Sequence, residues 1–448
     1  MSFAVRAWTS FLIMAALFLW VGLAQSWNVS LAIFNLCLIS SLTALGLNMQ
    51  WGYAGLFNAG VMASTAVGGL AAILVSHSPV GEAWSAGASG LLMSLLILLG
   101  LIFGVLGLRR TMAPGALRTS LLVLVVVGGY ALLRFFFDEA AQAIEAVDPG
   151  KTGFLGGLGL PVLSSWLAGG LAAAGVAWLI GRISLGLRSD YFAIATLGIS
   201  EITISILKNE DWLTRGVKNV TGLERPVPYE LELQQATWFV KAVQALSGIQ
   251  EESALNETLV SASGVFVKLC YSALFLTVLL VILGLAVKAL HSPWGRMMRA
   301  IRDNEVAASA MGKDVVARHR QVFLLGSAVM GIAGAMLTTL DGQFTPGAYN
   351  PLRFTFLIWV MVVVGGSGSN LGSVVGAFVV WFLWIEAEPT ALWAMGHVIE
   401  WLDESSPLRQ PLLDAAPHMR MVVMGSMLLL VLRLSPGGIL PERTSQSG

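Results

Sequence analysis

The sequence is poor in charged residues, which make up 12% of its 448 residues. Soluble domains usually carry about 25%. Acidic and basic residues also balance to a net charge of zero, so no electrostatic surplus would attract nucleic acid. We therefore expect neither a large soluble domain nor a nucleic-acid partner.

Residues for metal or redox chemistry are equally scarce. The chain has two cysteines, Cys37 and Cys270, and both lie in or beside apolar runs. None of the five histidines has a second histidine or a cysteine at ligand spacing. The sequence therefore predicts no disulfide framework, no metal site and no cofactor bound by this chain. It also lacks a cluster of catalytic groups, so we expect no catalytic residue.

Long apolar runs are abundant instead, because 56% of the residues are hydrophobic. Runs of about 17–25 apolar residues are long enough to cross a membrane. We expect an all-α polytopic membrane protein, a single transmembrane domain over 1–448, with about 10–12 transmembrane or re-entrant helices. The short pieces at 354–366 and 371–386 are either full spans or one re-entrant hairpin. The expected spans are 8–24, 29–50, 56–76, 90–108, 119–137, 163–181, 191–207, 265–289, 321–340, 354–366, 371–386 and 419–434.

The distribution of charge predicts how these spans are oriented. The segment 288–320 carries seven basic and three acidic residues, which favours the cytoplasmic side. Acidic residues dominate 208–262 and 386–418. We therefore expect a cytoplasmic loop at about 290–319, a periplasmic insertion at about 208–262 and a periplasmic loop at about 386–418. Both termini are then cytoplasmic.

Two extramembrane segments are predicted to form helices. Apolar residues between Tyr229 and Leu246 recur at helical spacing, which is typical of an amphipathic helix on the outer surface. It either caps helix ends or offers a platform for a partner. On the inner side, Pro293 and Gly312 bound a run of good helix formers. This helix either docks into a soluble partner or belongs to a basic loop that only fixes topology.

Glycines recur at spacings that suit close packing of helices. Gly368, Gly372 and Gly376 are four residues apart, directly after Gly365 and Gly366, and we expect the three to share one helix face. Gly52, Gly55, Gly60, Ser64 and Gly68 predict a similar flat face in the third span. Tight packing and direct contact with solute both remain open as their role.

Polar residues inside the spans are candidates for a translocation pathway. A carboxylate at the centre of a membrane helix costs about 2.5 kcal/mol or more, so Glu201 should face a cavity or a partner. It serves either structural hydrogen bonding or the pathway. We predict a pathway lined by Asn48, Gly52, Gly55, Asn58, Thr196 and Glu201.

Five motifs, in order along the chain, resemble the LivM-type permeases of branched-chain amino acid ABC importers. They are Leu45–Asn48 with Gly52–Leu56, Arg188–Gly198 followed by Glu201-Ile202, Gly295–Gly312, Val364–Ser369, and Leu434–Leu440. In that family the third motif contacts the ATPase. The resemblance thus implies a coupling loop formed by Gly295, Arg296, Arg299, Ala300, Ile301, Arg302, Asp303, Asn304, Glu305, Ala307, Ala308 and Gly312.

The resemblance also implies partners. A second related permease would complete a heterodimer, and two cytoplasmic ATPase subunits would supply ATP and Mg²⁺. A periplasmic binding protein would deliver the solute to this multi-pass subunit in the bacterial inner membrane, among its lipids. Two alternatives stay open: an ABC permease for urea or short amides, and an ion-coupled secondary transporter. The latter needs several ionisable residues in the spans, where the sequence offers essentially Glu201 alone.

Overall fold

The chain is almost wholly helical. The computed structural model describes residues 3–147, 153–214, 216–248, 252–400 and 409–442. In these ranges the only strands are β1 (Val220–Thr221) and β2 (Gln343–Phe344), which pair antiparallel. Ten helices are long and apolar enough to cross a membrane, and two shorter apolar helices accompany them. The prediction of an all-α polytopic membrane protein is confirmed.

Each expected span corresponds to one apolar helix. The short pieces at 354–366 and 371–386 are two separate helices, α15 and α16, and of the two only α16 is long enough to cross a membrane. The twelve helices are α1 (Phe3–Ala24), α2 (Trp27–Asn48), α3 (Val61–Ser76), α4 (Gly81–Thr111), α5 (Ala116–Glu145), α6 (Val162–Ser184), α7 (Ser189–Asn209), α11 (Glu252–His291), α14 (Val315–Asp341), α15 (Pro351–Gly365), α16 (Asn370–Glu400) and α18 (Met419–Leu434).

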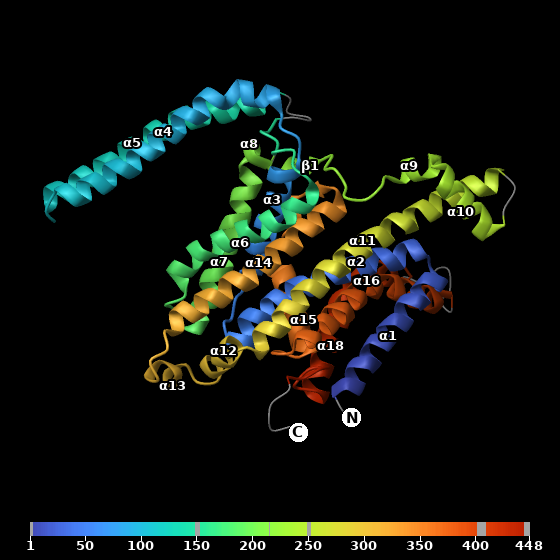
Figure 1. The fold of residues 1–448 in the computed structure, drawn as a ribbon. Coiled ribbons are helices and arrows are strands. Elements are labelled where there is room, and N and C mark those ends of the chain that lie inside the picture. The colour runs from blue at the N-terminus through green and yellow to red at the C-terminus, as the bar shows by residue number, and fades with distance from the viewer. Residues whose placement is uncertain (1–2, 148–152, 215, 249–251, 401–408, 443–448) are drawn as a thin grey trace.

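Short elements gather at the two ends of the bundle. The N-terminus, the C-terminus, α12 and α13 lie at one end, and β1, α8, α9 and α10 lie at the other (Figure 1). This grouping agrees with the charge pattern, which placed both termini on the side of residues 290–319. The short elements are η1 (Met49–Tyr53, a π-helix), α8 (Asp211–Thr214), η2 (Gly216–Lys218), α9 (Glu230–Gln235), α10 (Thr237–Ser247), α12 (Pro293–Asp303), α13 (Glu305–Ala310), η3 (Pro346–Ala348), α17 (Arg409–Ala415) and η4 (Ala416–His418).

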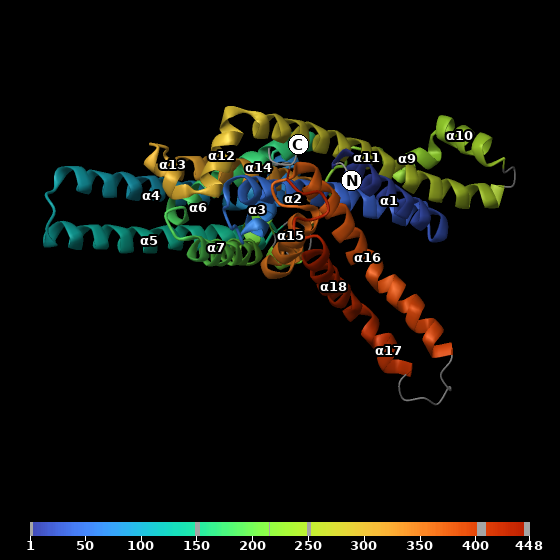
Figure 2. The ribbon, with the colours of Figure 1, turned by 90° about the horizontal axis from the view of Figure 1, so that it is seen from below.

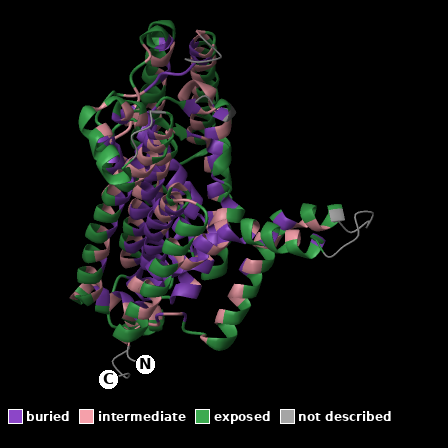
Figure 3. Cartoon of the chain, turned by 90° about the vertical axis from the view of Figure 1, so that its right-hand side faces the viewer, coloured by how far each residue is buried: buried purple, intermediate pink, exposed green. Residues whose placement is uncertain are grey.

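The core of the bundle lies around α14, which packs against α2, α3 and α6. Buried residues concentrate in this centre, while exposed residues cover the outward faces (Figure 3). Glycine makes the close packing possible. A Cβ atom on Gly68 of α3 would lie 1.9 Å from the backbone oxygen of Gly331 on α14. The two backbones therefore touch at a separation that no larger residue permits.

Glycines also bring α15 and α16 together. A Cβ on Gly365 would lie 2.0 Å from the oxygen of Gly372, and one on Gly376 would lie 1.9 Å from that of Met361. The expectation that Gly368 shares this helix face is wrong. Gly366 and Gly368 have φ angles of 117° and 80°, so they form the turn that precedes α16.

The prediction of a flat glycine face in the third span is also wrong, because most of its residues lie outside the helix. Helix α3 begins at Val61, so Gly52, Gly55 and Gly60 precede it. Gly52 lies in η1, and Gly55 has a φ of 74° in the loop that follows. Of the predicted set, Ser64 and Gly68 alone belong to α3.

Two groups of helices project from the bundle. Helices α4 and α5 pack mainly on each other and extend to one side, while the far part of α16 diverges with α17 and α18 (Figure 2). Helix α16 continues to Glu400, well past the predicted boundary at 386, because Pro389 is accommodated inside it. The centre of the expected loop at 386–418, residues 401–408, lies outside the described residues.

The insertion at 208–262 is largely helical where it is described; residues 215 and 249–251 lie outside that part. The single amphipathic helix expected between Tyr229 and Leu246 is divided at Ala236 into α9 and α10. Phe239 and Val243 on α10 are buried, as the apolar spacing predicted. Helix α11 already begins at Glu252, so the last part of the insertion is helical and continues into the next expected span.

Candidate functional site: the polar network below α12

Helix α12 begins at a well-formed cap. The Ser292 side chain accepts a hydrogen bond from the backbone N–H of Gly295, and Pro293 occupies the first turn. Gly295, Met298 and Ile301 recur every third residue and are buried, so this side of α12 faces the bundle. A Cβ on Gly295 would lie 2.3 Å from the oxygen of Leu290, which explains why α12 can turn so tightly after α11.

The expected single helix over 293–312 is two helices. Asn304 has an extended backbone and ends α12, and its side chain then accepts a hydrogen bond from the N–H of Ala307 to cap α13. Gly312, with a φ of 76°, ends the segment. Asn304 was predicted as a contact residue, and the structure gives it this capping role as well.

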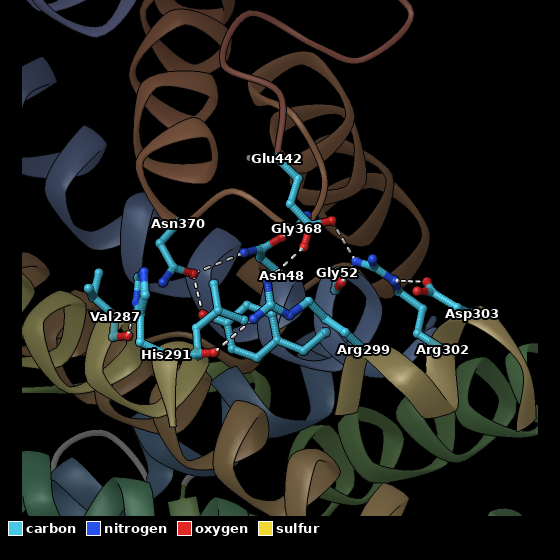
Figure 4. A network of polar contacts seen from close by, with 12 residues as sticks. Asn48, Gly52, Val287, His291, Arg299, Arg302, Asp303, Gly368, Asn370 and Glu442 are labelled. Carbon is cyan, nitrogen blue, oxygen red and sulfur yellow. Dashed lines mark hydrogen bonds and ion pairs between the residues drawn. The ribbon is translucent and has the colours of Figure 1, made fainter. Parts of the chain in front are cut away.

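Two arginines of α12 hold a carboxylate from the far end of the chain (Figure 4). Arg302 donates to Glu442 over 2.8 Å, and Arg299 lies 3.8 Å from the other carboxylate oxygen. The side chains of Arg302 and Glu442 are 24% and 16% exposed, so this ion pair is largely withdrawn from solvent. Sequence reasoning missed Glu442, because nothing in the local pattern links residue 442 to residue 302.

The same arginine reaches the membrane-spanning core. Its guanidinium donates to the backbone oxygen of Gly52 in η1 (Figure 4). Gly52 lies against the glycine turn, since a Cβ there would be 2.6 Å from the nitrogen of Gly368. Arg302 also lies beside Gly55, where a Cβ would be 3.4 Å from its side chain. One side chain of α12 therefore contacts η1, the loop that follows η1 and the C-terminal segment.

Asn48 joins η1 to the turn between α15 and α16. Its side-chain oxygen accepts from the N–H of Gly368 over 2.8 Å, and its amide donates to Asn370 over 3.2 Å. The hydroxyl of Tyr53 donates to the same oxygen of Asn370. Because Asn48 and Tyr53 are fully buried, their polar groups are satisfied by this network rather than by water.

Asn58 and Thr196 belong to a second polar cluster. Asn58 donates to Gln50 over 2.7 Å and accepts from the N–H of Gly60 over 2.8 Å. Thr196 on α7 accepts from the N–H of Ala59 over 3.1 Å. The structure thus divides the predicted pathway residues between two clusters, and these hydrogen bonds fix loop geometry around η1.

Glu201 stands apart from both clusters. It lies on an exposed face of α7, together with Ile194 and Ile202, and it is not among the residues that line the cavity between α2, α3, α14, α15 and α16. The buried face of α7 is formed by Phe192, Thr196, Ser200, Ile204 and Leu207. Within this chain, the described residues provide Glu201 with no ion pair.

The remaining predicted contact residues form an outward surface. Arg296, Ala300, Asp303, Glu305 and Ala307 are exposed, whereas Ile301 is buried and Ala308 is half-buried. Sequence reasoning missed two apolar members of this surface, Val306 and Met311, which are each 80% exposed. We call the exposed side of α12 and α13 the outward surface. It combines both signs of charge with apolar side chains, as protein interfaces do.

Known relatives cover much of the chain. The LivM permease proteins of the high-affinity branched-chain amino acid transport systems of Salmonella typhimurium and Escherichia coli are each 28% identical, over 213 and 214 residues. These alignments cover 46% of this chain and 47% of each relative, so the chain spans about half the length of these curated relatives. The probable branched-chain amino acid transport permease protein LivM of Methanocaldococcus jannaschii is 23% identical over 411 residues, or 90% of both chains. No solved structure matches the chain.

A family profile extends these likenesses. It matches residues 139–432 and is described as the permease component of the branched-chain amino acid transport system. The matched region contains α12, α13 and the turn with Gly366 and Gly368, and it begins after α4 and most of α5. Because the match covers well over half of the sequence, the chain belongs to the family of branched-chain amino acid transport permease components.

Proposed function

We propose that the chain is the non-catalytic membrane subunit of an ATP-driven importer for branched-chain or other hydrophobic amino acids, in a bacterial inner membrane. The family match over residues 139–432 carries this proposal. The names of the relatives specify branched-chain amino acid transport. ATP and Mg²⁺ bind to other subunits, and this chain binds no cofactor.

The outward surface of α12 and α13 is the docking site for the ATPase in this proposal. It is exposed, while the opposite side of α12 is held to the bundle through Met298, Ile301 and Arg302. A displacement of α12 by the ATPase reaches η1 through the contact of Arg302 with Gly52, and reaches the turn at Gly368 through Asn48. These contacts support α12 as the element that passes ATP-driven motion to the membrane spans.

The second permease subunit covers the exposed face of α7. A carboxylate that faced lipid at mid-membrane would cost roughly 2.5–3.5 kcal/mol. Glu201 is exposed beside Ile194 and Ile202, so a protein partner or a water-filled pathway at the subunit boundary relieves this cost. The heterodimer supplies both, and Glu201 then lies at its boundary.

At the opposite end of the bundle, α9 and α10 offer a surface to the binding protein. Phe239 and Val243 anchor α10, and Trp238 and Leu246 are 57% and 89% exposed. An exposed aromatic residue on an anchored helix suits a protein contact. This surface supports the hypothesis that the amphipathic segment is a platform for a partner, rather than only a cap on helix ends.

Reconstitution tests the function directly. The subunit, co-expressed with its second permease and ATPases, is placed in proteoliposomes with the binding protein outside, and uptake of labelled leucine and urea is compared. We expect leucine uptake that requires ATP inside the vesicle. Urea uptake without leucine uptake would favour an amide carrier, and leucine uptake driven by an ion gradient without ATP would favour a secondary transporter.

A further inference from the structure

A partly open cavity of about 230 Å³ lies between α2, α3, α14, α15 and α16. Neither polar cluster of the functional site lines it. Pockets for drug-sized ligands occupy about 300–1,000 Å³, so this cavity suits a smaller molecule. Its lining runs from buried residues such as Ile39 and Met361 to Asp341 and Ala348, which are exposed.

The wall of the cavity is apolar over most of its area, and aliphatic side chains form a large part of it. Side chains from four helices form this part, and none of them carries a charge. An aliphatic ligand group placed here would gain about 25 cal/mol for each Å² of apolar surface removed from water. These side chains are Leu36, Ile39, Met62, Leu337, Leu357, Ile358 and Met361.

One carboxylate breaks this apolar lining. Asp341, the last residue of α14, lines the cavity and is exposed, and no described residue forms an ion pair with it. No basic residue lines the cavity. A carboxylate without a cation at the edge of an apolar cavity attracts a cationic group such as an ammonium.

Hydrogen-bond donors complete the lining. The indole N–H of Trp381 is buried and has no hydrogen-bond partner among the described residues. A buried donor without a partner costs about 1–3 kcal/mol, so a ligand acceptor placed there would recover that cost. Tyr349 also lines the cavity, and its hydroxyl lies 3.1 Å from that of Thr338.

We propose that this cavity binds the transported amino acid during its passage, with Asp341 holding the α-ammonium group and the aliphatic wall holding the branched side chain. The donors of Trp381 and Tyr349 face the ligand's carboxylate. The assignment rests on the proposed function for the class of solute. It adds a solute site inside this single subunit, away from the boundary with the second permease.

Photolabelling of the assembled transporter tests the site. The complex is illuminated with a photoreactive diazirine analogue of leucine, and labelled peptides are mapped by mass spectrometry. We expect labels on Leu337, Ile358 or Met361 that excess leucine suppresses. Asp341→Asn should reduce this labelling about tenfold, because it removes a charge-assisted hydrogen bond, and Asp341→Glu should restore part of it. Glu82→Gln changes an exposed carboxylate in the first turn of α4 and should leave labelling unchanged.

Any of four results would overturn the site. The site is excluded if labels appear only on other residues, or if excess leucine does not suppress them. It is also excluded if Asp341→Asn is labelled as strongly as the unmodified complex. A co-purified lipid chain that occupies the cavity in every preparation would exclude it as well. If the complex takes up leucine with ATP yet shows one of these results, the site fails and the proposed function stands. If the complex carries no hydrophobic amino acid, the proposed function fails.

Discussion

Arg302 and Glu442 form an ion pair over 2.8 Å, although 140 residues separate them in the chain. The pair joins α12 to the segment that follows α18. Arg302 continues to the backbone of Gly52, so one guanidinium holds three parts of the chain together. Beside the chain link from α11 to α12, this guanidinium connects α12 to η1 at the end of the second span.

Replacing Glu442 by Gln should therefore loosen α12. Loss of a charged hydrogen-bond partner lowers the free energy of unfolding by about 1.5–3 kcal/mol. Arg302 would lose the Glu442 carboxylate, which is largely shielded from solvent. We expect a lower thermal midpoint of the purified subunit and several-fold slower ATP-driven uptake. Asp303→Asn is the matched control for stability, because Asp303 pairs with the same arginine but is 68% exposed. Equal midpoints for both variants would contradict the proposed role of Glu442.

Reversing the charge at Glu305 should uncouple transport. Glu305 is exposed at the start of α13, so Glu305→Arg leaves the bundle intact and alters only the outward surface. We expect normal amounts of subunit in the membrane and strongly reduced ATP-driven uptake. Glu257→Arg, an exposed change near the start of α11 at the opposite end, is the control. Unchanged uptake in the Glu305 variant would remove α13 from the docking site.

Glu201→Gln should affect assembly rather than folding of the isolated chain. If Glu201 faces the second permease, loss of its charge weakens a contact, and co-purification of that subunit or the kinetics of uptake should change. If Glu201 faced lipid, the neutral variant would instead be more stable, since it avoids a cost of about 2.5–3.5 kcal/mol. Normal assembly together with normal uptake would make the residue dispensable.

Gly376→Ala should destabilise the protein because the added Cβ would lie 1.9 Å from the oxygen of Met361. Gly100 on α4 provides the control, since a Cβ there meets nothing within 4 Å. Alanine in a helix interior is favoured over glycine by about 1 kcal/mol, so Gly100→Ala should be neutral or stabilising. Opposite shifts in thermal midpoint would confirm that contact with α15, rather than helix propensity, sets the identity of residue 376.

The fold was largely predictable from the sequence, because apolar length and charge asymmetry are local signals. The spans, the turn into α12 and the buried face of α10 all followed from such patterns. The break at Asn304 was also within reach, since an asparagine before Glu305 is a common start of a helix. The role of Gly368 could not be predicted, because glycines four residues apart can lie either in a turn or on one helix face. Glu442 could not be found either, since its partners are distant in sequence.

Helix α11 mechanically links the two ends of the bundle. Its 40 residues form one unbroken helix, which at 1.5 Å per residue is a rod of about 60 Å. Helices α9 and α10 pack against it near one end, and α12 follows directly at the other. The two ends cannot shift independently unless the rod bends. In the proposed importer, one rigid helix therefore joins the surface offered to the binding protein, on α9 and α10, to the proposed ATPase docking site on α12 and α13.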